Sequence, residues 1–205
     1  MEQELKYLIP DAQTAQRILD SSLVRSAAAA GQQRIEMHAA YYDTAQGDLA
    51  AHGVSYRIRR ENGRCVATVK TGGAQHGAMH ERGEWELPAR PDEPDLKAFA
   101  ERFGKEGGEQ LSAALAAAGE KPLVPLCGTD FVRTLLVIER DGACFEFCVD
   151  IGQLIKGEKR GPICELELEY KKGDIAVMEG FGAALRDAFG LSDGAKSKFA
   201  RARAL

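Results

Sequence analysis

The start of the chain alternates charged and apolar side chains, and the same alternation returns in segment after segment. Residues 2–9 read EQELKYLI. In an extended strand successive side chains point to opposite faces, so Glu2, Glu4 and Lys6 share one face. The other face is apolar and carries Leu5, Tyr7 and Ile9. An apolar face has to pack against a second layer, so each such segment is predicted to be a strand covered on one side.

Turn and capping signals divide the chain into short strands and a few helices. We predict strands at residues 2–9, 34–43, 54–60, 65–71, 80–87, 131–139, 144–150 and 163–170. We predict helices at 11–20 with Asp11 as N-cap, at two positions within 94–118 separated by Gly107-Gly108, and from Gly173-Asp174 to about 189. A polar turn is expected near Asp48 and Gly53, and a Gly-flanked surface loop near His76 and His80. This order predicts an α+β fold, and with no flexible linker we expect a single domain over residues 1–205.

The charged faces of these strands carry both signs in dense sets. Their carboxylates are Glu2, Glu4, Glu84, Glu86, Glu146, Asp150, Glu165, Glu167 and Glu169. Their cations are Lys6, Arg57, Arg59, Lys70, Arg82 and Arg133. The opposite faces are rich in aromatic and branched residues, which we expect to be buried under helices. A sheet that is covered by helices outside and charged inside can close into a barrel with a polar lumen.

Charges inside a barrel are costly unless they pair or bind a ligand. Carboxylates that converge, such as Glu165 and Glu167 on one face, repel each other unless a cation lies between them. Oxygen ligands of this kind suit Mg²⁺ or Mn²⁺, and Mg²⁺ is usually bound by few carboxylates together with phosphates. Arginines and lysines that face the same space suit phosphate oxygens. The residues alone therefore predict a metal–polyphosphate site inside a barrel.

The composition argues against several other classes of function. The chain of 205 residues has a formal net charge of −4, which gives no reason to expect a nucleic-acid polymer or a membrane as partner. No segment approaches a transmembrane span and the acidic start is unlike a signal peptide, so we expect a cytoplasmic protein. The five cysteines form no C-x-x-C pair and are expected to be reduced. Gly152–Gly157 fails as a phosphate-binding loop because Glu158 follows where that motif needs lysine.

Short motifs recur in a fixed order along the whole chain, beginning with Glu2-x-Glu4-x-Lys6. The later ones are Tyr42-Asp43-Thr44, Arg57-x-Arg59, Thr68-x-Lys70, Arg82-x-Glu84, Thr129-Asp130-Phe131-x-Arg133, Asp150, Glu165-x-Glu167-x-Glu169 and Ser197-Lys198. This ordered set resembles the CYTH superfamily, the triphosphate tunnel metalloenzymes. Within it the chain is most similar to the bacterial inorganic triphosphatases. In some of these a helical CHAD domain follows, and with the sequence ending at Leu205 we expect a CYTH domain without it.

The resemblance implies a closed tunnel of eight antiparallel strands, flanked by helices, and a role for each matched residue. The implied metal ligands, for Mg²⁺ or Mn²⁺, are Glu2, Glu4, Glu165 and Glu167. The implied phosphate-binding residues are Lys6, Arg57, Arg59, Lys70, Arg82, Arg133 and Lys198. Glu84 and Asp150 would support these groups, and Glu169 leaves open which pair of the three-glutamate strand holds the metal. The residues expected to carry catalysis are Glu4, Lys6, Arg57 and Glu167.

The implied reaction is metal-dependent hydrolysis of inorganic triphosphate to pyrophosphate and phosphate. Alternatives within the superfamily are a thiamine triphosphatase and a class IV adenylyl cyclase. An alternative of another class is a polyphosphate-binding module without turnover, although binding alone would not need the acidic residues. A structural protein with a salt-bridged barrel is disfavoured because buried charges stabilise poorly by themselves. A homodimer is left open.

Overall fold

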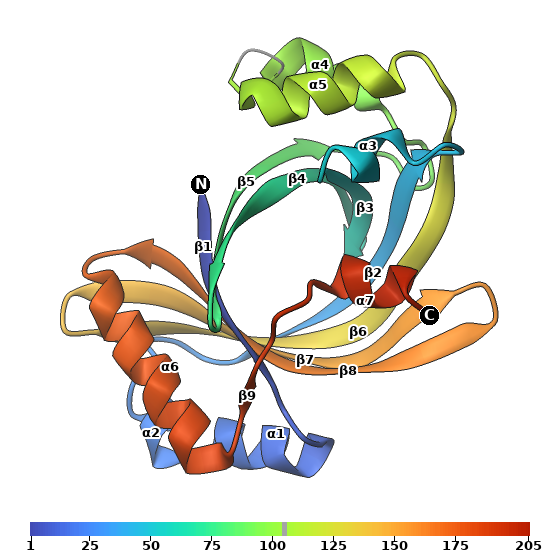
Figure 1. The fold of residues 1–205 in the computed structure, drawn as a ribbon. Helices are drawn as coiled ribbons and strands as arrows, with labels where there is room; N and C mark the ends of the chain where they lie inside the picture. Colours follow the sequence, from blue (N-terminus) through green and yellow to red (C-terminus); the bar gives the residue numbers. More distant parts are fainter. Residues whose placement is uncertain (104–105) are drawn as a thin grey trace.

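A computed structural model of the chain describes residues 1–103 and 106–205. Eight antiparallel strands form its barrel: β1 (Glu2–Leu8), β2 (Gln33–Thr44), β3 (Ser55–Glu61), β4 (Arg64–His76), β5 (Met79–Pro88), β6 (Leu123–Arg140), β7 (Ala143–Lys156) and β8 (Lys159–Lys172). They are ordered β5-β4-β3-β2-β6-β7-β8-β1, and pairing of β1 with β5 closes the ring (Figure 1). A short β9 (Ser192–Asp193) pairs with β1 outside the ring. The predicted α+β fold with a closed eight-stranded barrel is confirmed.

The helices are α1 (Ala12–Asp20), α2 (Ser22–Arg25), α3 (Asp48–Ala51), α4 (Leu96–Phe103), α5 (Gly108–Ala118), α6 (Ile175–Phe189) and α7 (Lys198–Arg203). The first six cover the outside of the barrel in two layers, whereas α7 packs against β6 and β7 and contributes Lys198 and Phe199 to the lining of the lumen. In Figure 1, α3, α4 and α5 lie over β3–β5, while α1, α2 and α6 lie on the opposite side, against β1, β7 and β8. None of the helices in the described part of the chain is long and apolar enough to cross a membrane.

The helix starts follow the capping signals of the sequence. The Asp11 carboxylate accepts a hydrogen bond from the backbone N–H of Thr14 at 2.7 Å, and Asp174 caps α6 through the N–H of Ala176. Each cap satisfies a backbone donor that has no partner within the helix, which is commonly worth about 1 kcal/mol. The predicted helix boundaries at Asp11 and Asp174 are therefore confirmed, as are the two helices within 94–118.

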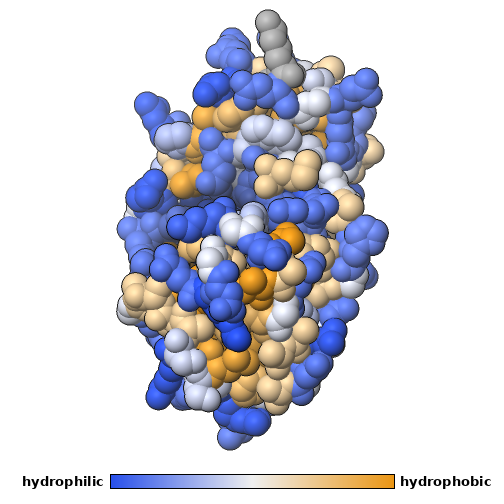
Figure 2. Space-filling model, turned by 90° about the vertical axis from the view of Figure 1, so that its left-hand side faces the viewer, coloured by the Kyte–Doolittle hydropathy of each residue, from blue (hydrophilic) through white to orange (hydrophobic). Residues whose placement is uncertain are grey.

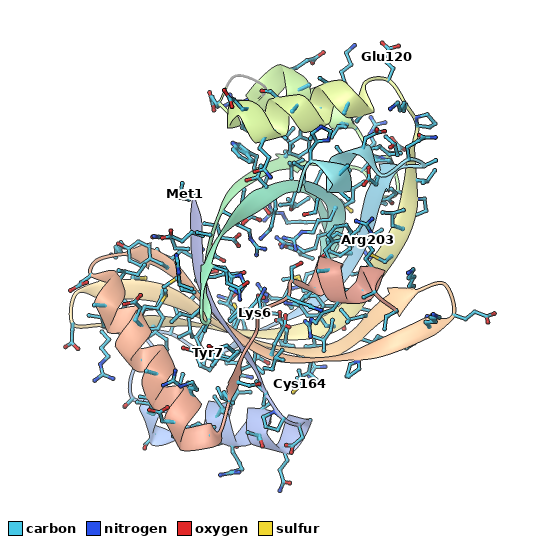
Figure 3. All side chains as sticks on the ribbon, in the orientation of Figure 1. Met1, Lys6, Tyr7, Glu120, Cys164 and Arg203 are labelled. Carbon is cyan, nitrogen blue, oxygen red and sulfur yellow. The ribbon has the colours of Figure 1, made fainter. Side chains whose placement is uncertain are left out.

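The apolar strand faces are buried under these helices, as the alternation predicts. Leu5 and Tyr7 of β1 belong to a core with α1 and α6, and Figure 3 shows Tyr7 on the outer side of the ring and Lys6 on the inner side. A second core packs Tyr56 and Val69 against α4 and α5. Burying a large apolar side chain contributes about 1.5–3 kcal/mol, so these cores fix which face of every strand turns inward.

The structure corrects several predicted boundaries. Strand β6 begins at Leu123 rather than at residue 131, because the strand tolerates Pro125 at a register shift opposite Tyr41 and Tyr42. The β7–β8 hairpin extends to Lys156 and Lys159, well past the predicted ends at residues 150 and 163. Residues between 71 and 80, predicted as a loop that includes His76 and His80, instead extend β4 and β5. The turn near Asp48 contains the short helix α3, and α2 was not predicted.

Gly152, the first residue of the Gly152–Gly157 segment, lies where β7 packs too closely against β6 for any larger side chain. In β7, an added Cβ on Gly152 would lie 2.2 Å from the backbone oxygen of Asp130 and 2.4 Å from Cα of Phe131. We expect Gly152→Ala to lower the free energy of unfolding by about 2 kcal/mol or more, because β6 would have to shift. Gly180→Ala in the exposed interior of α6 meets nothing within 4 Å and should raise it by about 0.5–1 kcal/mol. Urea denaturation of both variants tests the pair, and equal effects would contradict this reading.

Candidate active site

The barrel encloses a cavity of about 520 Å³ that is lined mainly by charged side chains. Its eight carboxylates are Glu2, Glu4, Glu61, Glu84, Glu86, Glu146, Glu167 and Glu169. Its eight cations are Lys6, Arg57, Arg59, Lys70, Arg82, Arg133, Lys171 and Lys198. Figure 2 shows the outer surface on one side of the barrel, where hydrophilic residues border a hollow between the two helical layers. The predicted charged lumen is confirmed.

The acidic residues of β1 are paired with cations from β4 and β5. Glu2 Oε1 lies 2.8 Å from Lys70 Nζ, and Glu2 Oε2 lies 2.7 Å from Arg82 Nε. Glu4 Oε1 accepts from Arg82 Nη2 at 2.6 Å and from Lys6 Nζ at 3.2 Å. Burial opposes ionisation of Glu2, but Lys70 and Arg82 outweigh it and hold its pKa well below the ordinary value. Burial and the neighbouring Glu2 carboxylate raise the pKa of Glu84, the next carboxylate in this group.

A second acidic group lies on the side of the lumen formed by β7, β8 and α7, and Lys198 is at its centre. Carboxylate oxygens of Asp150, Glu165 and Glu167 all lie within 4.8 Å of one another. Lys198 Nζ pairs with all three: it is 2.7 Å from Asp150 Oδ2, 2.9 Å from Glu167 Oε1 and in close contact with Glu165. Burial opposes the charge of Lys198, but the three carboxylates raise its pKa above the ordinary value.

Two arginines complete this buried group. Arg133 forms a bidentate pair with Asp150 at 2.8 and 2.7 Å, and its Nη2 also donates to Glu167 at 2.6 Å. Arg201, one turn after Lys198 in α7, pairs with Glu165. Burial opposes the charge of Glu167, but Lys198, Lys6 and Arg133 hold its pKa well below the ordinary value. The ion pairs of the buried group join α7 to the barrel wall.

The structure separates the predicted metal ligands into two sets. Glu2, Glu4 and Glu167 line the lumen, whereas Glu165 is fully buried. Glu169 lines the lumen and pairs in register with Glu4 across β1 and β8. The lumen positions therefore favour Glu167 and Glu169 as the pair that faces a ligand, and the ligand role of Glu165 stays a prediction. Asp150 is also buried and accepts a hydrogen bond from Arg133 Nε, and its supporting role stays a prediction.

The seven predicted phosphate-binding residues all line the lumen, and Arg57 is the least paired of them. Its guanidinium is 3.7 Å from the nearest Glu84 oxygen, and its buried Nε has no hydrogen-bond partner among the described residues. A buried donor without an acceptor is costly, and such groups commonly mark a ligand site. Arg57 is therefore the cation of the lumen with most capacity for an anion.

Sequence reasoning missed five charged or aromatic residues of the site: Tyr41, Glu61, Lys171, Phe199 and Arg201. Glu61 and Lys171 could have been found, because each continues by one step an alternation that was recognised, that of Arg57 and Arg59 or that of Glu167 and Glu169. Phe199 and Arg201 depend on tertiary placement, since α7 reaches the lumen only by packing against β6 and β7. Among the described residues, the group of potential metal ligands contains no histidine. All five cysteines are free, as predicted.

The structure is therefore a closed antiparallel barrel with paired charges throughout its lumen. Residues 1–202 match the family model of the CYTH domain, and the chain belongs to this family. A protein of Haemophilus influenzae named inorganic triphosphatase is 33% identical over 135 residues, which are 66% of this chain and 36% of that protein. The aligned region is thus about a third of the length of this curated relative.

Solved structures share the fold at low sequence identity. HpAC1 from Hippeastrum, described as a candidate adenylyl cyclase with a dominant triphosphatase activity, has a TM-score of 0.68 at 21% identity and covers 100% of this chain and 96% of its own. The PH1819 protein from Pyrococcus horikoshii has a TM-score of 0.54 at 17% identity, with coverage of 97% and 96%. At these identities the comparison shows a common fold.

Proposed function

We propose that this chain hydrolyses inorganic triphosphate to pyrophosphate and phosphate inside the barrel, with the help of a divalent metal ion. The observation that carries the proposal is the lumen itself, in which seven predicted phosphate-binding cations converge and Arg57 keeps an unpartnered buried donor. The name of the Haemophilus relative and the activity described for HpAC1 support the same substrate class. We also propose that residues 1–205 act as one domain. The cytoplasmic location and the homodimer stay predictions.

The donor set of the lumen fits a hard divalent cation. The lumen carboxylates offer oxygen ligands only, which suits Mg²⁺ or Mn²⁺. The eight carboxylates and eight cations of the lining balance formally, so a triphosphate with several negative charges needs added positive charge. Glu2, Glu4, Glu167 and Glu169 would hold the metal, with the buried group around Glu165 as the alternative set. A bound metal would neutralise phosphate charge and make water a better nucleophile.

The side chains of the lumen supply the remaining parts of the reaction. Arg57, Arg59 and Lys70 bind phosphate oxygens, and Arg can do so through two donors at once. Lys6 and Arg82 pair with Glu4 in this structure, and they would also bind phosphate oxygens, while Glu4 would be one of the residues that hold the metal. Positioning and charge neutralisation dominate phosphoryl transfer, so fixed cations stabilise the departing pyrophosphate. Glu84 orients Lys70, Asp150 orients Arg133 and Lys198, and a lumen carboxylate accepts the proton of the attacking water.

Phosphate release from inorganic triphosphate, ATP and thiamine triphosphate, each with Mg²⁺, Mn²⁺ or EDTA, tests the proposal. We expect turnover of inorganic triphosphate that EDTA reduces by about 100-fold or more. The eight cations of the lining are formally balanced by eight carboxylates, so neutralising the substrate needs the charge of a metal ion. Preferred turnover of thiamine triphosphate, or formation of cyclic AMP from ATP, would replace the substrate assignment. Tight triphosphate binding without turnover under any condition would identify a binding module instead.

A further inference from the structure

Two adjacent tyrosines of β2 have opposite environments. Tyr42 lies in the outer core with Tyr56, and its hydroxyl donates to Asp92 at 3.4 Å. Tyr41 turns inward, lines the lumen and is 4% exposed. Because strand neighbours alternate between faces, the core around Tyr42 fixes Tyr41 in the lumen. Tyr41 therefore has a buried hydroxyl in the lumen, and Tyr42 has a hydroxyl outside the lumen that can serve as a matched control.

Tyr41 stands on a lumen wall that is otherwise mostly apolar. The wall formed by β2 and β6 contributes Ile35, Met37, Phe131 and Leu135 to the lining, and its one cation, Arg133, is engaged by Asp150 and Glu167. The Tyr41 ring packs against the ring of Phe199 from α7, with centroids 5.0 Å apart. This contact and the low exposure leave the ring little freedom, so its hydroxyl has a fixed direction.

Arg57 lies directly opposite Tyr41 in the pairing of β2 with β3. Side chains of such cross-strand pairs start about 4.5–5.5 Å apart at Cβ and interact on the same face. A guanidinium can only donate hydrogen bonds, so between these two groups the Tyr41 oxygen is the acceptor. Burial disfavours the charge of Arg57, but the Tyr41 hydroxyl and Glu84 raise its pKa above the ordinary value.

Arg57 has no strong carboxylate partner to hold it in place, unlike the other cations around it. Arg82 has two carboxylates within 2.7 Å and Lys70 has one at 2.8 Å, whereas Glu84 is 3.7 Å from Arg57. A flexible arginine that is ordered only when substrate binds loses side-chain entropy at that step. A neutral acceptor on the opposite strand orders it without neutralising its charge.

We propose that Tyr41 is a positioning residue for substrate, whose hydroxyl orients the Arg57 guanidinium toward the phosphates of the triphosphate. The proposal rests on the proposed function of the lumen. Because the hydroxyl acts on binding rather than on the reacting atoms, its loss raises KM and changes kcat little. The Phe199 contact needs only the ring, so it persists when the hydroxyl is removed.

The test compares Tyr41→Phe with Tyr42→Phe in initial-rate kinetics with inorganic triphosphate and Mg²⁺. Tyr41→Phe is expected to raise KM about tenfold with kcat within about twofold, as a lost hydrogen bond to a charged group predicts. Tyr42→Phe should leave both constants unchanged. Thermal denaturation checks that both variants fold. An unchanged KM in folded Tyr41→Phe, or a loss confined to kcat, overturns the proposal.

A double-mutant cycle shows whether Tyr41 acts through Arg57. In an Arg57→Gln background, adding Tyr41→Phe should change KM by less than about twofold, because the group that it orients is gone. An additive tenfold effect overturns the proposal. If the wild-type chain hydrolyses no triphosphate, the proposed function is wrong, but the role of Tyr41 in binding can still be tested. Calorimetric affinities for inorganic triphosphate across the same cycle then decide that role. Equal affinities of wild type and Tyr41→Phe, or no binding by either, would then overturn it.

Discussion

Replacing Glu4 with glutamine is expected to lower triphosphate hydrolysis by about 100-fold or more while the barrel stays folded. Glu4 is 3% exposed and lies between Lys6 and Arg82, in register with Glu169. The substitution keeps the shape of the side chain but removes the negative charge that a divalent ion needs. It would also leave Lys6 and Arg82 without the carboxylate that positions both of them at the centre of the site.

The fold should survive because both cations keep another partner. Arg82 retains Glu2 at 2.7 Å, and Lys6 retains Glu167 at 3.1 Å, so Glu4→Gln leaves neither charge buried alone. We expect the midpoint of thermal unfolding to stay within about 5 °C of the wild type. Glu86→Gln is the control, since Glu86 is at the rim with a side chain 43% exposed and should lose less than about threefold. Near-normal turnover of Glu4→Gln, or its unfolding, would refute the assignment of Glu4.

Alternation along the strands was enough to predict the lumen. In β1, Glu2, Glu4 and Lys6 turn inward because Leu5 and Tyr7 are buried under α1 and α6. The apolar cores therefore decide which way the charged residues point, and the sequence shows both the apolar and the charged positions. The same argument holds for Arg57 and Arg59 in β3, whose intervening Ile58 belongs to the outer core.

Depth within the barrel could not be predicted in this way. Glu165 and Glu169 share a face of β8, yet Glu165 is fully buried and Glu169 lines the cavity. The difference comes from α7, which places Lys198 and Arg201 over Glu165. The periodicity of a strand predicts which face a residue is on, but not how far along the barrel axis it lies. The helix α7 has only six residues, and its sequence does not indicate which strands it packs against. Tyr41 was missed for a related reason, since only the β2–β3 register places it beside Arg57.

Replacing Lys198 with methionine is expected to lower the free energy of unfolding at neutral pH by about 3 kcal/mol or more. The ammonium separates three carboxylates whose oxygens lie within 4.8 Å of one another, and two of them, Asp150 and Glu165, are fully buried. Arg133 and Arg201 would remain, but they cannot replace the charge at the centre of the group. Lys171→Met is the matched control: Lys171 also bridges two carboxylates, Glu146 and Glu169, but its side chain is 38% exposed, so it should cost less than about 1 kcal/mol.

The dependence on pH distinguishes lost charge from lost packing. In the wild type the pKa of Glu167 is depressed, so its stabilising contribution is present at neutral pH and declines as the pH falls below its unfolded value of about 4.5. In Lys198→Met the same carboxylates repel one another, and protonation relieves the repulsion as the pH falls. The stability difference between the two proteins should therefore shrink from pH 7 to pH 4 in urea denaturation. A difference that stays constant with pH would contradict a stabilising role for the charge of Lys198.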